Sequence, residues 1–150
     1  MFFKTHLIIT LFFVLIFIQN IENQFLFLLV AVFATALPDI DSHFSFLGKR
    51  FKIFNFFLKH RGIVHSFTFL FAISILLFMF WKEILFPFVF GYSLHLFFDA
   101  ITLQGIFPFY PFGKKFRGFV KTGGLFEKIV LVLFFLGDLF LLSILFNNIL

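Results

Sequence analysis

Five long apolar runs limit what this chain can fold into. They cover residues 7–18, 25–37, 64–80, 84–100 and 126–146. Hydrophobic residues make up 62% of the chain and charged residues only 13%, against about 25% charged in a soluble domain. A water-soluble core of this size cannot bury so much apolar surface, so the runs predict helices in a bilayer. We expect an all-α, polytopic membrane bundle of about five transmembrane helices, forming one domain over residues 1–150. The first two runs are short for a full span, which needs ~20 residues.

The basic residues predict how this bundle is oriented. The five-helix arrangement places eleven of the twelve lysines and arginines on one side: Lys4, Lys49, Arg50, Lys52, Lys59, Arg61, Lys114, Lys115, Arg117, Lys121 and Lys128. Only Lys82 lies on the other side. Because cytoplasmic segments of membrane proteins carry an excess of lysine and arginine, the basic side is predicted to face the cytoplasm. The predicted location is therefore the inner or plasma membrane, crossed several times.

Two connecting segments on the basic side predict contacts with membrane lipids. Residues 46–60, "FLGKRFKIFNFFLKH", alternate basic and aromatic side chains, which favours an amphipathic helix lying in the interface. A solvated connector is the alternative. Residues 105–118 form an aromatic loop punctuated by proline and glycine, which could lie along the membrane surface over a site. The chain has no nucleic-acid-binding motif, so no nucleic-acid partner is expected.

Ionisable residues, rare in this chain, converge on the basic side. The first two helices are joined by the short "QNIENQ" and run antiparallel, so the start of the first meets the end of the second. The third helix leaves this layer, the fourth returns to it, and the fifth begins in it. The layer therefore collects His6, Asp39, Asp41, His60, His65, His95, Asp99 and Glu127. Ionisable residues in membrane helices are costly, which indicates a functional site.

Two pairs of residues have a spacing suited to holding one cation. His95 and Asp99 are separated by four residues, which stacks them on one face of a helix. A packed histidine beside a capping aspartate would have the same spacing. Asp39 and Asp41 would point to the same side of an extended backbone, and two crowded carboxylates favour a cation between them. The alternative is that Asp41 or Ser42 caps the following helix.

The stretch "HRGIVHS", residues 60–66, adds two imidazoles at the start of the third helix. His60 and His65 are five residues apart, so they do not share a face of a regular helix. Gly62 can relax the backbone, so that His60 reaches from the loop and His65 from the first helical turn. Arg61 could hold a phosphate or a carboxylate. Ser66 is expected only to cap the helix or to bond locally.

Together these residue types predict a metal site. Histidine and carboxylate ligands without cysteine suit zinc, and also manganese or iron. Such a metal would acidify a bound water and polarise a phosphoryl oxygen, with Asp41 or Glu127 as general base. Basic residues and lipid around the site favour a lipid-like phosphoester substrate. The alternatives are a metal that only fastens helix ends and a metal or proton transporter. Asp138, in the middle of the fifth helix, is expected to serve helix packing.

The motifs resemble a known family over nearly the whole chain. "LPDID", "HRGIVHS" and "GYSLHLFFDAIT", with His6 before them and "KTGGLFE" after them, resemble the YdjM-like membrane-bound metal-dependent hydrolases. The pattern is also distantly similar to zinc-dependent phospholipase C, which binds zinc through histidine and aspartate. The resemblance implies metal ligation by all eight residues of the layer, most loosely by Glu127. Members often carry histidine directly after the second aspartate, where this chain has Ser42 and then His43.

Overall fold

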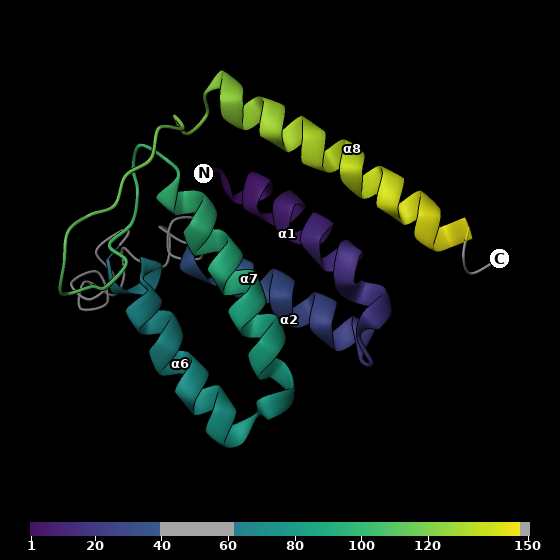
Figure 1. Cartoon of the computed structure of the whole chain (residues 1–150), viewed down its shortest axis with the longest axis horizontal. Coiled ribbons are helices and arrows are strands. Elements are labelled where there is room, and N and C mark those ends of the chain that lie inside the picture. Colours follow the sequence, from purple (N-terminus) through teal and green to yellow (C-terminus); the bar gives the residue numbers. More distant parts are fainter. Residues whose placement is uncertain (40–61, 148–150) are drawn as a thin grey trace, which may run out of the picture.

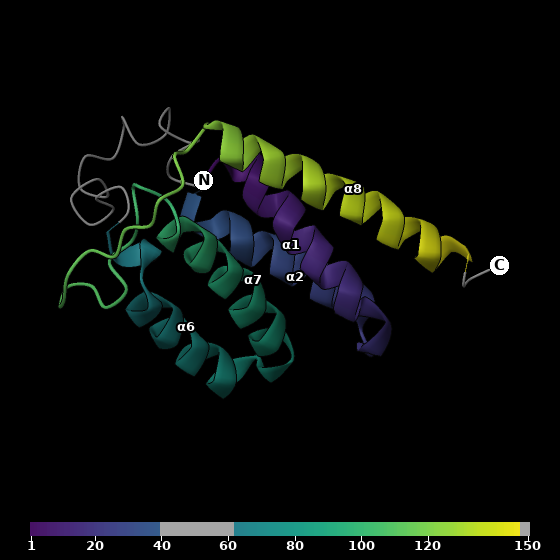
Figure 2. The ribbon, with the colours of Figure 1, turned by 45° about the horizontal axis from the view of Figure 1, so that its top comes forward.

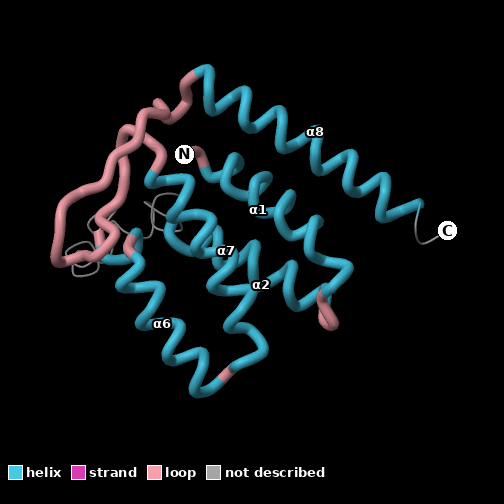
Figure 3. Tube along the Cα trace, in the orientation of Figure 1, coloured by secondary structure: helices cyan, strands magenta, loops and turns pink. Residues whose placement is uncertain are grey.

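The computed structural model describes residues 1–39 and 62–147, and this part of the chain is helical. Its helices are α1 Phe3–Phe17, α2 Gln24–Ala36, α6 Phe67–Phe80, α7 Lys82–Ala100 and α8 Leu125–Asn147. Short 3-10 turns cover Ile18–Asn20, Leu37–Asp39 and Ile63–His65. No strand occurs in the described ranges (Figure 3), so the all-α prediction is confirmed. The predicted interfacial helix over residues 46–60 lies outside the described residues.

Three segments are long and apolar enough to cross a membrane: Phe3–Asn20, Lys82–Ala100 and Leu125–Asn147. The other two apolar helices, Gln24–Asp39 and Phe67–Phe80, are shorter. The 14 residues of α6 extend for about 21 Å, against a hydrocarbon core of about 30 Å. Each predicted apolar run contains a helix, although two of the five are short for a full span. The third run is one of these, because its first residues form a 3-10 turn instead of α-helix.

The five helices form a bundle in which α1 packs between α8 and α2, α2 packs on α7, and α7 packs on α6 (Figure 1). The rotated view shows the same order (Figure 2). The starts of α1, α6 and α8 lie at one end of the bundle, together with the ends of α2 and α7. This arrangement brings polar residues from distant parts of the sequence to one level, as the antiparallel connections predicted.

A close contact between α1, α2 and α7 sets the position of that polar level. A Cβ atom on Gly91 would lie 2.1 Å from the carbonyl oxygen of Ala31, so the backbones of α2 and α7 touch. The Thr35 hydroxyl donates to the carbonyls of Ala31 at 2.9 Å and Gly91 at 3.0 Å, and it lies 2.9 Å from the hydroxyl of Thr10 on α1. Small and hydroxyl-bearing residues allow such close packing of membrane helices.

This contact lies one helical turn below three of the predicted ligands. Thr10 follows His6 by four residues, Thr35 precedes Asp39 by four, and Gly91 precedes His95 by four. Because residues four apart lie on the same face of an α-helix, the packing contact directs His6 and His95 toward each other. Asp39 follows in the 3-10 turn that continues α2. The threonines therefore fix the geometry of the site without being part of it.

The helix ends differ in detail from the sequence prediction. His65 lies in the 3-10 turn Ile63–His65 rather than in the first turn of α6, because Ser66 is the N-cap and accepts a hydrogen bond from the Phe69 amide at 3.2 Å. Asp39 lies in a 3-10 turn. The extended backbone that was predicted to point Asp39 and Asp41 to the same side is therefore absent at Asp39. The connector between α6 and α7 is Trp81 alone.

The segment between α7 and α8 is an irregular loop, as predicted. It is held by isolated bridges between Thr102 and Val120 and between Ile106 and Phe116. The loop is also tied to the start of α6, because the Phe67 amide donates to the carbonyl of Pro108 at 2.8 Å. It therefore lies beside the end of the bundle that holds the polar residues (Figure 1).

Candidate metal centre

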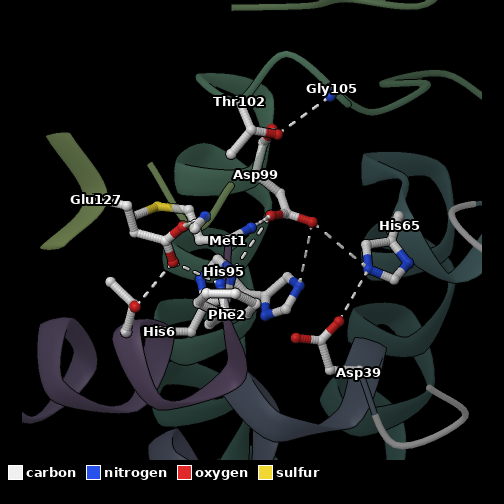
Figure 4. A network of polar contacts seen from close by, with 12 residues as sticks. Met1, Phe2, His6, Asp39, His65, His95, Asp99, Thr102, Gly105 and Glu127 are labelled. Atoms are coloured by element: carbon white, nitrogen blue, oxygen red, sulfur yellow. Dashed lines mark hydrogen bonds and ion pairs between the residues drawn. The ribbon is translucent and has the colours of Figure 1, made fainter. Parts of the chain in front are cut away.

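Three imidazoles and two carboxylates meet at the polar end of the bundle (Figure 4). His6 comes from α1, Asp39 from the turn after α2, His65 from the turn before α6, and His95 and Asp99 from α7. All five are buried, with Asp39 the most exposed at 8%. The predicted convergence of these residues is therefore present in the structure.

Asp99 is the centre of this cluster. Its Oδ1 lies 3.2 Å from His6 Nε2 and contacts the amino group of Met1. Its Oδ2 lies 3.7 Å from His65 Nε2 and 3.8 Å from His95 Nε2. One carboxylate thus faces all three imidazoles, and the four-residue spacing of His95 and Asp99 places both in the same cluster, as predicted.

The imidazoles are close to one another as well as to the carboxylates. The rings of His6 and His95 are stacked with centroids 4.0 Å apart, and those of His65 and His95 are 5.3 Å apart. The Nε2 atom of His65 also lies 3.6 Å from Asp39 Oδ1. Imidazole nitrogens are common metal ligands, so three rings at these distances form a set of donors that could serve one cation.

Two overlapping sets of residues could each hold a metal ion. One set is His6, Asp39 and His95, and the other is His65, His95 and Asp99; within each set the potential ligand atoms lie within 4.8 Å of one another. Three ligands of this kind with a further position left open are typical of catalytic zinc sites. His95 belongs to both sets, which makes it the central ligand.

Buried nitrogen atoms provide an independent test of whether a cation fits. Both ring nitrogens of His95 and Nδ1 of His6 are buried and have no hydrogen-bond partner within residues 1–39 and 62–147. An unsatisfied buried polar group costs about 1–3 kcal/mol. A bound cation would supply the missing partner, so the donor set fits a metal better than it fits an ordinary packed core.

The charge state of Asp39 also suits a cation. Burial raises the pKa of Asp39, but a hydrogen bond from His65 and the nearby imidazoles of His95 and His6 lower it. The net effect is a pKa below the usual value for aspartate. Asp39 therefore presents an ionised carboxylate at the edge of the cluster.

Glu127, a predicted ligand, reaches the same layer, but its described contacts are with a different set of partners. Its Oε1 accepts hydrogen bonds from the Phe2 amide at 2.6 Å and the Thr5 hydroxyl at 2.9 Å, and its Oε2 accepts from the Gly123 amide at 2.7 Å. It belongs to neither set of potential ligands. Since three donors engage the carboxylate, we assign Glu127 to holding α8 against the start of α1.

The replacement Glu127→Gln tests this assignment. We expect the variant to keep nearly the metal content of the unmodified protein, because the residue contacts the N-terminal segment instead of the ligand atoms. Its thermal stability should fall, because charge-assisted hydrogen bonds are worth about 1.5–3 kcal/mol each. Metal analysis and thermal unfolding of the same detergent-purified sample measure both effects. A loss of metal as large as that of a His95 variant would return Glu127 to the ligand set.

The other predicted residues divide into two groups. Asp41, His60 and Arg61 lie outside the described residues. Asp138 is buried in α8, eleven residues beyond Glu127, which is about 16 Å along the helix. Sequence reasoning missed Thr5, which binds Glu127, and the Thr10–Thr35 contact. Hydroxyl residues four positions from a ligand, inside apolar runs, were the signal that could have found the Thr10–Thr35 contact.

Comparison with known proteins identifies the family. The family described as YdjM inner membrane protein matches residues 1–148, so the chain belongs to this family. No curated protein and no solved structure matches the chain.

Proposed function

We propose that this member of the YdjM inner membrane protein family is a membrane-bound, metal-dependent hydrolase. The observation that carries the proposal is the buried cluster of His6, Asp39, His65, His95 and Asp99, whose ligand atoms come from four separate segments. Bringing five ionisable side chains together at the end of an apolar bundle is costly, and a metal-binding role accounts for that cost.

The residues of the cluster would hold the metal, with zinc the best fit and manganese or iron also compatible. When bound, such a metal lowers the pKa of water and polarises a phosphoryl oxygen. Asp99 orients the three imidazoles, and Asp39 supplies a negative charge at the more exposed edge of the cluster. Asp41, next to this edge in sequence, is proposed as the general base, and Arg61 as the group that holds the phosphate.

A phosphoester with a lipid-like body is the proposed substrate. The exposed cations Lys4, Lys121 and Lys128 come from the segments that surround the cluster, and they favour an anionic substrate. The helices beside the cluster expose apolar side chains to the bilayer, so a substrate held in the membrane would reach the site from its lipid face. Membrane lipids are therefore the proposed partners.

Hydrolysis assays with and without a chelator test the proposal. The detergent-purified protein is expected to cleave phosphodiester or phosphomonoester substrates only when zinc or manganese is supplied, and to lose this activity on chelation. Asp138→Asn is the matched control, because it removes a buried carboxylate without touching the cluster. Activity that persists after thorough chelation would contradict the metal-dependent mechanism.

Two rival functions make different predictions in the same experiments. A metal that only fastens helix ends would raise the unfolding temperature but give no hydrolysis with any phosphoester. A transporter would move zinc or protons across vesicle membranes, and it would require polar residues through the full thickness of the bundle. Among the described residues on the far side of the Thr10–Thr35 contact from the cluster, Asp138 of α8 is the only buried acidic or basic side chain. The described part of the chain therefore offers a transporter few of the polar residues that it requires.

The proposed orientation places the metal centre at the cytoplasmic face. At the end of the bundle that holds the cluster lie the start of α1, the loop between α7 and α8, and the start of α8, and α8 leads away from that end (Figure 1). These described segments carry Lys4, Lys114, Lys115, Arg117, Lys121 and Lys128. A reporter enzyme that works only outside the cytoplasm is therefore expected to be active when it is joined after Leu150. A reporter that works only inside the cytoplasm is expected to be active when it is inserted in residues 101–124. A cytoplasmic signal from the reporter after Leu150 would contradict the five-span arrangement.

A further inference from the structure

An apolar groove runs along the outer side of α6 and α7. It has a volume of about 740 Å³, within the range of about 300–1,000 Å³ that is usual for small-ligand sites. Its walls include Phe67 and Phe71 from α6, Phe86 and Val89 from α7, and Phe109 from the loop between α7 and α8. The groove is thus a hollow built from three segments, unlike the convex face of a single helix.

The lining of the groove selects an apolar occupant. Ser74, one of its few polar residues, donates its hydroxyl hydrogen bond to the carbonyl of Leu70 at 2.7 Å and so is satisfied within the helix. From Phe67 to Ser74 the groove follows α6 for about 10 Å, in the direction that leads away from the metal cluster. An elongated apolar hollow of this kind matches a hydrocarbon chain.

The end of the groove near the metal centre lies beside a loop that carries basic residues. Phe67 follows His65 by two residues, and its amide is bonded to Pro108, which places the loop over this end of the groove. The same loop carries Lys114, Lys115 and Arg117. The ammonium of Lys115 lies 5.5 Å from the ring centroid of Phe107, which holds this cation on the arm of the loop that supplies Phe109. A ligand with an acyl chain in the groove would therefore have its polar end among cations.

We propose that the groove between α6 and α7 binds one acyl chain of an anionic phospholipid, with the lipid phosphate held by Lys114 and Lys115 of the loop. The apolar hollow supplies affinity for the chain, and the lysines supply the preference for a negative headgroup. This lipid site is distinct from the metal cluster and does not depend on hydrolysis, so it can be tested whether or not the protein is an enzyme.

Photo-cross-linking on the unmodified protein tests the location. The protein is placed in bilayers that contain phosphatidylglycerol with a photoactivatable acyl chain, and labelled peptides are mapped by mass spectrometry. Labels are expected to concentrate on residues 67–74 and 85–89. The exposed face of α8 around Leu133, which is 62% exposed, is the control surface for ordinary lipid contact. Equal labelling of α8 and the groove would overturn the proposal.

Two sets of variants test the groove and the charge separately. Ser74→Trp and Val89→Trp should fill the groove and reduce labelling several-fold, whereas Leu133→Trp should leave it unchanged. The double replacement of Lys114 and Lys115 by alanine should reduce the preference for phosphatidylglycerol over phosphatidylcholine about 30-fold, because each lysine near an anionic surface contributes about 1 kcal/mol. Groove labelling with no preference for the anionic lipid would overturn the proposal as stated.

Discussion

Replacing His95 with alanine is expected to lower the affinity of the site for zinc by more than about 100-fold, because even residues that only support a ligand cost 10–100-fold when they are removed. His95 is the residue shared by both sets of potential ligands, and its side chain is fully buried between His6 and His65. Zinc titration of the detergent-purified protein against a competing chelator measures the change. Hydrolysis, if the proposed function holds, should fall to the background rate.

A double variant distinguishes one shared site from separate effects. When His65→Ala and His95→Ala are combined, the loss of zinc affinity should be smaller than the sum of the two single losses in free energy, since a site that has lost its central ligand has little left to lose. Asp138→Asn should bind zinc like the unmodified protein. Zinc affinity that survives His95→Ala would show that zinc is bound without this residue, and it would contradict the shared site.

The second large effect is expected on stability. Asp99→Asn should lower the free energy of unfolding of the metal-free protein by about 3–5 kcal/mol, the usual result of removing one partner from a buried ionic contact. The asparagine keeps the volume of the side chain but removes the negative charge that faces His6, His65 and the amino group of Met1. Thermal unfolding in detergent, followed by circular dichroism, measures the difference.

Asp138→Asn is the control for this experiment as well. Both carboxylate oxygens of Asp138 are buried without a hydrogen-bond partner among the described residues. Its replacement by a neutral amide of the same size therefore removes no described contact, and the unfolding temperature should not fall. An Asp99→Asn protein as stable as the unmodified one would mean that Asp99 does not hold the cluster together.

The helices could be predicted from the sequence because each apolar run is long enough for several helical turns and the bilayer allows few alternatives to a helix. The runs at 84–100 and 126–146 agree closely with α7 and α8. Helix ends were less predictable, because they depend on local bonds. Ser66 stops α6 from including His65, and Trp81 alone connects α6 to α7, although the pattern indicated a three-residue connector.

The ligand cluster could be predicted from topology, but its details could not. Antiparallel neighbours bring His6 and Asp39 to the level of His95 whatever the exact packing. The direction in which Glu127 points depends on the path of residues 1–5, which no spacing rule supplies. The close contact of Gly91 with Ala31 also lies beyond periodicity, because it requires knowing which faces of α2 and α7 meet.

The metal content of the purified protein tests the central claim most directly. The protein is extracted in mild detergent, stripped with a chelator, reconstituted with zinc and passed through a desalting column before elemental analysis. The cluster of three histidines and two aspartates predicts at least one tightly held zinc ion per chain in the unmodified protein and in Asp138→Asn, and almost none in His95→Ala. A zinc content in the unmodified protein no higher than in His95→Ala would contradict the metal centre.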